Sequence, residues 1–579
     1  MLAKLKLFLK EQKIDFFLLP NSDEFFSEYL PKHEKRIEYL TGFRGSNATI
    51  IFGVEKSYFF TDGRYILQAK NELDLSEFEI FNIADKSPLI WLKENLSEDK
   101  NLAVDAKLLS INFVKALPKR AKIIFLESNP VDKIWQNRVQ ANNSAVFFCD
   151  KNLTGSDSLT KRNQLLQSLE ADALIITKPE NICWLLNIRA ADIEFTPLLL
   201  AYAILFKNGE IDLFVDEKRI SDLNHPDLKG VNLIQADCFD LRIAVLRKSL
   251  KKIQIDAAST NYWLFQLLEK NNFEIINKTD AAELIKSCKN DAEIKSAIKS
   301  HIVDGIALTK FLFWLENSLK NDSEIDEIIA AEKLEEIRAR NQNFLYPSFA
   351  SISGFASNGA VIHYRANSKT NKKISGNSLY LIDSGGQYFG PNFLGTTDVT
   401  RVIAVGKPSA EMIENFTRVL KGHIALARAK FPVGTSGAQL DVLARSHLWQ
   451  AGLNYDHGTG HGVGSFLSVH EGPCAISKRS NQELLPGMIL SNEPGYYKDG
   501  EYGIRIENLM LVEKLDEKFL QFRTLTLAPI DPVLIDFKML TYPEKKWLKN
   551  YHETIQNLLS EGLGEDEKIW LQELSKKFS

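Results

Sequence analysis

Three histidines lie close together in the segment HGTGHGVGSFLSVH, which spans residues 457–470. His457 and His461 are four residues apart, a spacing that on a helix would present two imidazoles to one metal ion. The alternating glycines of this segment disfavour a helix, because glycine carries a large conformational entropy cost there. We therefore predict a loop that brings His457, His461 and His470 toward a ligand or metal ion from irregular directions.

Carboxylates stand at the ends of several apolar runs. Asp383 ends the run LYLI, Asp398 opens the run in TTDVTRVIAV, and Glu493 follows MILSN before a Pro-Gly turn. A carboxylate at the edge of a buried strand loses water, so it must be paired, hydrogen-bonded or bound to a metal. In GIRIENLML, Arg505 and Glu507 are two residues apart on a predicted strand and point to the same face. Taken alone, that couple is interpreted as a structural ion pair.

Four carboxylates and one imidazole from a single region indicate a different kind of site. Four negative charges in one pocket need cations to neutralise them, and two divalent ions would do so. Ligation by oxygen with one nitrogen and no sulfur favours Mn²⁺, with Zn²⁺ or Co²⁺ as alternatives. Two such ions roughly 3.5 to 4 Å apart can share a water, lower its pKa and polarise a carbonyl. The expected chemistry is hydrolysis.

The elements that would position these residues follow from the hydrophobic pattern. A long helix is expected where apolar residues recur with a 3.6-residue period over 294–312. Further helices are expected after residue 323, over 410–429 and over 438–450. Strands are expected over 378–383, 398–405, 488–492 and 503–512. This last region is therefore predicted to be mixed α+β.

The N-terminal half alternates helical patterns with short apolar strands, which is typical of α/β domains. The segment YLTGFRGSNA at 39–48 is faintly matched by WLLNIRAADI at 184–193, so a duplicated domain is expected. We place domain boundaries at the helix-poor stretch near residue 140 and near residue 284. The predicted domains are residues 1–139, 140–284 and 285–579.

Composition excludes several classes of protein. The chain of 579 residues has 71 Lys and Arg against 75 Asp and Glu, a balance that argues against a nucleic-acid-binding protein. Five scattered cysteines encode neither a disulfide framework nor a thiolate zinc site, which favours a reducing cytoplasm. The most apolar run, at 197–206, is about half of the ~20 residues that a membrane span needs, so no membrane segment is expected.

The motifs, in their order along the chain, resemble those of the long, three-domain Xaa-Pro aminopeptidases (aminopeptidase P) of the pita-bread metallopeptidase superfamily. The resemblance runs from RIEYLTGFRGSNA and FFTDGRY, through WLLNIRAADI, to AVIHYR, YLIDSGGQY, GTTDVTR, HGTGHGVGSFLSVHEGP, SNEPGYY and GIRIENL. It implies two creatinase-like α/β domains followed by a pita-bread catalytic domain with a C-terminal extension. One departure is the connection between Asp383 and Asp398, where GPNFLG at 390–395 is interpreted as a lengthened hairpin tip.

Residue by residue, the resemblance implies roles for the candidates. The implied metal ligands are Asp383, Asp398, His461, Glu493 and Glu507, with Asp398 and Glu507 shared between the two ions. His363, His457 and His470 are implied to hold the substrate and assist proton movement. Arg505 would lie behind Glu507 and orient it by a charge-assisted hydrogen bond.

The implied reaction is removal of the first residue from short peptides with proline in second position. Our mechanistic hypothesis is attack by a metal-bridging hydroxide, with the oxyanion stabilised by His470 or His363. Glu493 would accept the water's proton and pass it to the proline nitrogen. A homodimer is implied by the resemblance only. The alternatives are a prolidase, which cleaves Xaa-Pro dipeptides, and a non-catalytic pita-bread binding module.

Overall fold

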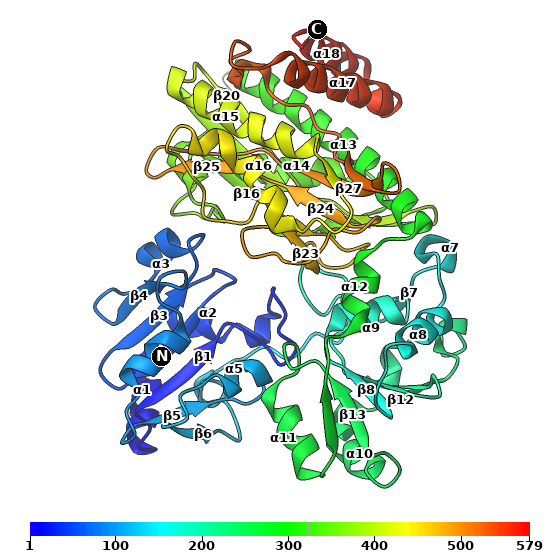
Figure 1. Ribbon diagram of the computed structural model, residues 1–579. Helices are drawn as coiled ribbons and strands as arrows, with labels where there is room; N and C mark the ends of the chain where they lie inside the picture. The colour runs from blue at the N-terminus through cyan, green and yellow to red at the C-terminus, as the bar shows by residue number, and fades with distance from the viewer. Residues whose placement is uncertain (322–323, 579) are drawn as a thin grey trace. The chain divides into compact units, whose positions relative to one another are not determined.

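The computed structural model describes residues 1–321 and 324–578. They form two compact units (Figure 1). The N-terminal unit contains residues 1–151 and 156–282, and the C-terminal unit contains residues 152–155 and the chain from Glu283 onward. Among the described helices, none is long and apolar enough to cross a membrane.

The N-terminal unit contains two six-stranded sheets of the same topology. The first, ordered β4-β3-β2-β1-β5-β6, consists of β1 (Phe16–Pro20), β2 (Thr49–Gly53), β3 (Ser57–Thr61), β4 (Phe78–Asn82), β5 (Asn101–Val104) and β6 (Lys122–Phe125). The second, ordered β12-β11-β10-β8-β13-β14, consists of β8 (Ala173–Ile176), β10 (Ala203–Phe206), β11 (Ile211–Phe214), β12 (Val231–Ile234), β13 (Lys252–Ile255) and β14 (Glu274–Asn277). In both sheets the first strand, β1 or β8, has one antiparallel and one parallel neighbour.

This shared topology confirms that the two α/β domains resemble each other. The matched segments 39–48 and 184–193 precede equivalent strands, β2 and β10. The helices of this half are α1 (Leu2–Glu11), α2 (Arg36–Thr41), α3 (Ile66–Glu72), α4 (Pro88–Asn95), α5 (Ile111–Lys115), α6 (Pro130–Ile134), α8 (Ser158–Leu166), α9 (Pro179–Leu185), α10 (Phe239–Leu246) and α11 (Tyr262–Lys270). The short strands β7 (Phe147–Phe148) and β9 (Ile188–Arg189) pair with each other. The division into three domains at 139 and 284 stays a prediction, because both sheets belong to one compact unit.

The C-terminal unit is built on several antiparallel sheets. A three-stranded sheet contains β16 (Ile352–Phe355), β17 (Ser378–Ser384) and β20 (Val399–Val405). A six-stranded sheet contains, in spatial order, β21 (Lys430–Pro432), β28 (Phe519–Thr524), β27 (Asn508–Lys514), β24 (Ile489–Asn492), β22 (Gly460–Gly462) and β23 (Glu471–Ile476). Smaller sheets contain β15 (Phe344–Pro347) with β18 (Gly386–Phe389) and β19 (Leu394–Thr396), and β25 (Gly495–Lys498) with β26 (Tyr502–Arg505).

Helices cover these sheets. They are α13 (Asp291–Lys320), α14 (Glu327–Ala339), α15 (Ala410–Ala427), α16 (Gly437–Trp449), α17 (Tyr542–Leu559) and α18 (Glu565–Lys576), preceded by the short α7 (Lys151–Thr154) and α12 (Ala281–Ser287). The long predicted helix is α13, which starts at a capping box between Asn290 and Glu293 and buries Leu308 and Leu312. Helices α15 and α16 lie side by side, and α17 and α18 pair near the C-terminus (Figure 1).

The lengthened connection between Asp383 and Asp398 is a hairpin. Strands β18 and β19 pair antiparallel with Phe389 opposite Leu394, and the amide of Gly390 donates to the carbonyl of Phe393 at the tip. The hairpin therefore leaves β17 and β20 paired along their length, while the greater length of its tip stays a prediction.

The strand expected over 503–512 is interrupted. Strand β26 ends at Arg505 in the small sheet, and β27 begins at Asn508 in the six-stranded sheet. The antiparallel segment that pairs with it makes the same change of sheet at Glu493 and Pro494, between β24 and β25. Thus β24–β25 and β26–β27 are the two arms of one bent hairpin. Glu493 and Glu507 both lie at the bend, where neither residue belongs to a strand.

A close backbone approach fixes the small sheet. The 3-10 helix η5 (Ala356–Ala360) packs against β26 and β17. A Cβ placed on Gly503 would lie 1.7 Å from the carbonyl oxygen of Gly359. Only glycine allows this contact, which brings the turn carrying His363 next to the strand that carries Arg505.

We predict that Gly503→Ala destabilises the protein by about 1–3 kcal/mol, because the backbone of η5 must move away from β26. The control is Gly458→Ala, where the nearest atom to an added Cβ lies at an ordinary 3.6 Å. Denaturant unfolding of both variants would measure the difference. Equal midpoints for the two variants would contradict the prediction.

Candidate metal centre

Five predicted side chains from separate elements converge in the C-terminal unit. Asp383 is on β17, Asp398 directly precedes β20, and His461 is on β22. Glu493 and Glu507 occupy the bend of the hairpin. Ligand-type atoms lie within 4.8 Å of one another in three groups, which are Asp383, Asp398 and Glu507; His461, Glu493 and Glu507; and Asp398, His461 and His470.

Sheet register brings the two aspartates together. Strands β17 and β20 pair with Asp383 opposite Thr400. Asp398 lies two residues before Thr400 and therefore faces the same side. The amide of Glu507 donates to the carbonyl of Thr400 at 3.2 Å, which places the third carboxylate at the same strand end.

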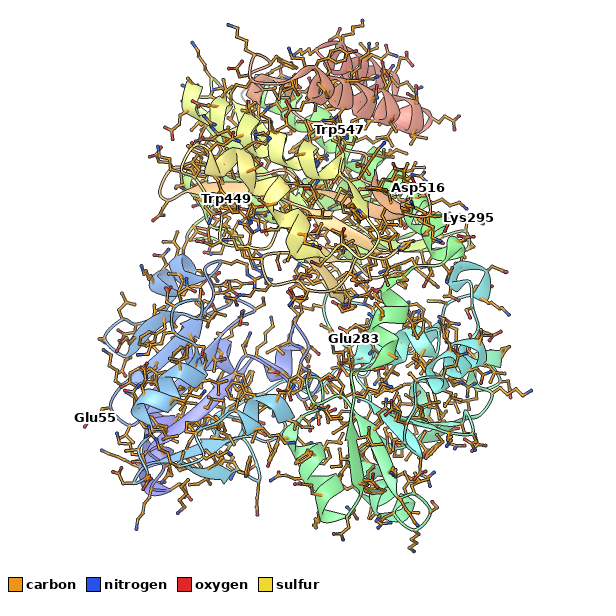
Figure 2. The ribbon with its side chains drawn as sticks, viewed as in Figure 1. Glu55, Glu283, Lys295, Trp449, Asp516 and Trp547 are labelled. Atoms are coloured by element: carbon orange, nitrogen blue, oxygen red, sulfur yellow. The ribbon has the colours of Figure 1, made fainter. Side chains whose placement is uncertain are left out.

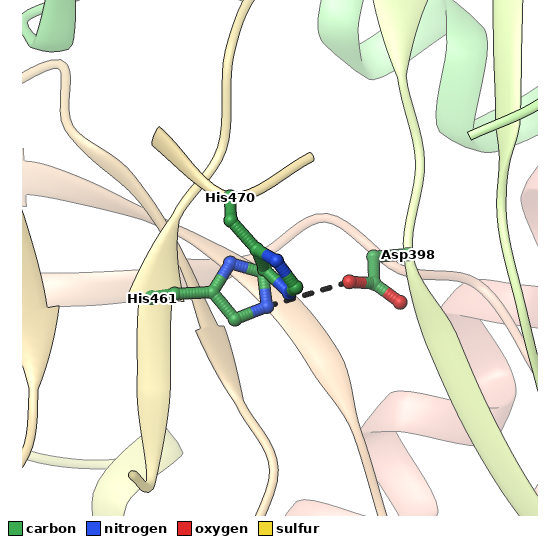
Figure 3. A group of neighbouring side chains, drawn as sticks. All are labelled: Asp398, His461 and His470. Carbon is green, nitrogen blue, oxygen red and sulfur yellow. Dashed lines mark ion pairs between the residues drawn. The ribbon is translucent and has the colours of Figure 1, made fainter. Parts of the chain in front are cut away.

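His461 faces two carboxylates with one nitrogen. Its Nε2 lies 3.4 Å from Asp398 Oδ2 and 3.6 Å from Glu493 Oε1. Its Nδ1 lies 3.0 Å from the carbonyl oxygen of Gly462. This contact fixes the ring with Nε2 toward the two carboxylates. Figure 3 shows the ion pair between His461 and Asp398, with His470 beside His461. The rings of the two histidines stand at 87° to each other with centroids 4.2 Å apart.

The electrostatics of the cluster are those of a site that needs cations. Burial raises the pKa of Asp383 to about 6, helped by Asp398 and Glu493 and opposed by Arg505. Burial and the charges of Asp398 and Glu493 raise the pKa of Glu507 well above its ordinary value. Burial alone would lower the pKa of His461, but Asp398 and Glu493 outweigh it and raise the pKa to about 9. Each shift reflects excess negative charge with too little compensation.

Unpartnered oxygens give a second sign that the residues fit metal ions. Asp383 Oδ1 and Asp398 Oδ1 are buried and have no hydrogen-bond partner. A buried carboxylate oxygen without a donor is costly unless a cation takes it. The set of four carboxylates and one imidazole suits hard or borderline divalent ions.

Arg505 is placed differently from the prediction. Its Nη2 donates to Asp383 Oδ2 at 2.5 Å, its Nε to Thr400 Oγ1 at 3.1 Å, and its Nη1 to the hydroxyl of Tyr497 at 2.8 Å. The prediction of a direct hydrogen bond from Arg505 to Glu507 is wrong, because the two residues do not share one strand. Thr400 links them instead by donating its hydroxyl to Glu507 Oε2 at 2.8 Å.

The outer histidines occupy distinct positions. His457 Nε2 lies 2.8 Å from the Tyr497 hydroxyl, and its Nδ1 lies 4.0 Å from Glu493 Oε2. His363 is half-buried in the turn after η5 and is not a member of the three groups found among the described residues. His470 belongs to one group.

Three polar residues at the site were not singled out from the sequence. Thr400 and Tyr497 connect the residues described above, and the Ser491 hydroxyl donates to Glu493 Oε1 while accepting the amide of His461. Alternation along GTTDVTR could have identified Thr400, because it shares a face with Asp398. For Tyr497 and Ser491 the signal was only their place in the motif around Glu493.

Comparisons with known proteins agree with this architecture. Metallopeptidase family M24 matches residues 295–514, and the C-terminal region of peptidase M24 matches 518–578. The creatinase/prolidase N-terminal domain matches twice, at 1–134 and 137–293.

Relatives match over nearly the whole chain. A probable Xaa-Pro aminopeptidase P of Laccaria bicolor is 37% identical over 601 residues that cover 99% of this chain and 92% of the relative. Xaa-Pro aminopeptidase 1 of Dictyostelium discoideum is 35% identical, covering 95% of this chain and 91% of the relative. The structure of the X-prolyl aminopeptidase of Caenorhabditis elegans, a cytosolic enzyme with a dinuclear active site, matches with a TM-score of 0.92 and 32% identity, covering 97% of this chain and 95% of that one.

A prolidase-type structure matches less of the chain. The Xaa-Pro dipeptidase from Bacillus anthracis covers 64% of this chain and 98% of its own, with a TM-score of 0.52 and 22% identity, which shows a shared fold alone.

The fold and the cluster of ligand-type side chains define a metal-dependent hydrolase. The chain belongs to the long Xaa-Pro aminopeptidases of metallopeptidase family M24. The family, the fold class and the enzyme class predicted from the motifs are thereby confirmed.

We predict that the metal-free protein loses stability through Asp383 as the pH rises from about 4 to about 6. The folded pKa of about 6 exceeds the ordinary 3.8, so folding retains a proton that the unfolded chain releases, and this advantage disappears as the pH passes the folded pKa. The difference in melting temperature between the chelator-treated wild type and Asp383→Asn isolates this effect. A difference that stays constant across the window would contradict it.

Proposed function

We propose that this protein removes the first residue from short peptides with proline in second position, using two divalent cations. The observation that carries the proposal is the convergence of four carboxylates and His461 in a buried cluster with unpartnered oxygens. The names of full-length relatives, and the dinuclear site of the Caenorhabditis elegans enzyme, support the same reaction.

The proposed ligands are Asp383, Asp398, His461, Glu493 and Glu507. Glu507 and Asp398 are proposed as the shared carboxylates, and each occurs in two of the three groups. Mn²⁺ is the proposed metal, with Zn²⁺ or Co²⁺ as alternatives, because the donors are mostly oxygen. Bound there, the two cations would polarise the scissile carbonyl and acidify a water molecule.

The side chains around the ligands have proposed roles in binding and proton transfer. Glu493 accepts a proton from the attacking water and passes it to the proline nitrogen. His470 or His363 stabilises the negative charge that develops on the carbonyl oxygen. His457 orients the substrate and is itself held by the Tyr497 hydroxyl. Arg505 keeps Asp383 oriented through one carboxylate oxygen.

Proline in the second position explains why such a centre is useful. An Xaa-Pro bond has no amide hydrogen, and the ring restricts the preceding residue to extended conformations. A peptidase that holds its substrate by backbone pairing loses a donor there. A site that acts on the carbonyl itself does not need that donor.

Two further properties belong to the proposal. A cytosolic location is proposed from the scattered cysteines and from the similarity to the cytosolic Caenorhabditis elegans enzyme. A homodimer is proposed from the family resemblance.

We expect metal-loaded enzyme to cleave a tripeptide such as Xaa-Pro-Xaa and release its first residue, while the matching Xaa-Pro dipeptide reacts poorly. The control is the same tripeptide with alanine in second position. Chromatography would measure the release of products. The metal content of the protein would be determined in parallel. Cleavage of the dipeptide alone would identify a prolidase instead, and a protein that retains no ion after manganese loading would favour a binding module.

Glu493→Gln should lower kcat by roughly 10²–10⁴-fold at saturating Mn²⁺, which is the usual contribution of a general base. The fold should persist, because glutamine has nearly the same volume. Glu513→Gln on β27 is the matched control and should retain wild-type turnover. Near-normal turnover of metal-loaded Glu493→Gln would exclude the proton-transfer role.

A further inference from the structure

His423 is a fully buried histidine on α15 that bonds to both arms of the bent hairpin. Its Nδ1 lies 3.1 Å from the carbonyl oxygen of Asn492, and its Nε2 lies 3.1 Å from Nδ2 of Asn508. The carbonyl accepts and the amide donates, so the ring is held as the neutral tautomer with its proton on Nδ1. Asn492 Nδ2 donates in return to the carbonyl of His423 at 2.9 Å.

The two asparagines stand directly beside two proposed ligands. Asn492 and Asn508 form the last register pair of β24 and β27. Glu493 follows the first asparagine, and Glu507 precedes the second. His423 therefore joins the two arms at the position where each leaves the six-stranded sheet and carries a carboxylate into the cluster.

A second set of contacts fixes Asn508 from its other side. Arg401 Nη2 donates to Asn508 Oδ1 at 2.7 Å, and Arg401 Nη1 donates to the carbonyl of Glu507 at 2.7 Å. Arg401 also donates to the hydroxyl of Tyr551 on α17 at 2.8 Å. Both ends of the Asn508 amide are thus satisfied, and its orientation is determined.

Helix α17 also supports the histidine. The ring of Trp547, labelled in Figure 2, stands at 73° to the His423 ring with centroids 5.9 Å apart. Trp547 and Tyr551 stack on each other within α17. The segment matched by the C-terminal region of peptidase M24 therefore contacts both His423 and Arg401.

We infer that His423, Asn492 and Asn508 form an asparagine clasp that positions Glu493 and Glu507 for metal binding, and that α17 holds this clasp through Tyr551. The inference deepens the proposed function, because it assumes that both glutamates are ligands. Ligand carboxylates must be held to within about 0.5 Å, and outer partners of metal ligands typically contribute 10–100-fold to affinity. The three clasp residues are positioning residues, since they act through the ligands.

His423→Leu tests the clasp, because it removes both ring hydrogen bonds and fills the space with an apolar side chain of similar bulk. The matched control is His552→Leu on α17. His552 is equally buried and also bonds through both nitrogens, to the carbonyl of Leu548 and the amide of Ile530, neither of which adjoins a proposed ligand. Mn²⁺ affinity is measured by titration of chelator-treated protein, together with the melting temperature.

We expect His423→Leu to bind Mn²⁺ at least tenfold more weakly than His552→Leu, at a similar loss of melting temperature. His423→Gln should recover part of the affinity, because its amide oxygen can accept from Asn508. If His423→Leu does not fold, Tyr551→Phe decides, with Tyr202→Phe in the N-terminal unit as its control. Tyr551→Phe should then show the weaker Mn²⁺ binding and Tyr202→Phe should not.

The outcomes separate the inference from the proposed function. If the wild type binds two ions and His423→Leu binds them as tightly as His552→Leu, the clasp is refuted and the function stands. Should His423→Leu not fold, unchanged Mn²⁺ affinity in Tyr551→Phe refutes the clasp. If the wild type binds none of Mn²⁺, Zn²⁺ and Co²⁺ in the same titration, both the function and the clasp are refuted.

Discussion

Mutual repulsion among four carboxylates, three of them buried, is the constraint on which the rest of the structure depends. Asp383, Asp398 and Glu507 have ligand-type atoms within 4.8 Å of one another, and Glu493 lies as close to Glu507 and His461. The pKa values of Asp383 and Glu507 rise because burial and neighbouring acids oppose ionisation. Such a cluster is stable only when cations or protons neutralise it. Because the proposed ligands come from or lie next to different strands, cation binding would also tie together segments more than a hundred residues apart.

The bend in the hairpin brings Glu493 and Glu507 into the cluster. An unbroken ladder would pair Glu493 directly with Glu507, use their backbone groups in that pairing and hold both side chains on one face of the sheet. The change of sheet frees both residues from that pattern. The amide of Glu507 then bonds to Thr400 of another sheet, and the amide of Glu493 bonds to the carbonyl of Thr459. The two carboxylates thus reach the aspartates of β17 and β20.

The sequence predicted most elements and the correct set of converging residues, but not every partner. Apolar runs marked β17, β20 and β24 within a residue or two, and periodicity marked α13, α15 and α16. Arg505 was assigned to Glu507 because period-two alternation was assumed to continue through residue 507. The change of sheet depends on pairing with β24 and β25, which lies outside any local pattern. The contacts of His423 could not be predicted, since a bond to two distant asparagines has no local signature.

Each aspartate has one oxygen that faces a protein group and one buried oxygen without a hydrogen-bond partner, which suits the proposed metal binding. Asp383 Oδ2 is held by Arg505, while Oδ1 has no hydrogen-bond donor. Asp398 Oδ2 lies nearest His461, and its Oδ1 is likewise unpartnered. A carboxylate oriented through one oxygen pays little entropy when the other meets a cation, because its rotamer is already fixed. The cost of leaving those oxygens unpartnered falls on the metal-free state, so the same atoms that destabilise the empty cluster favour the loaded one.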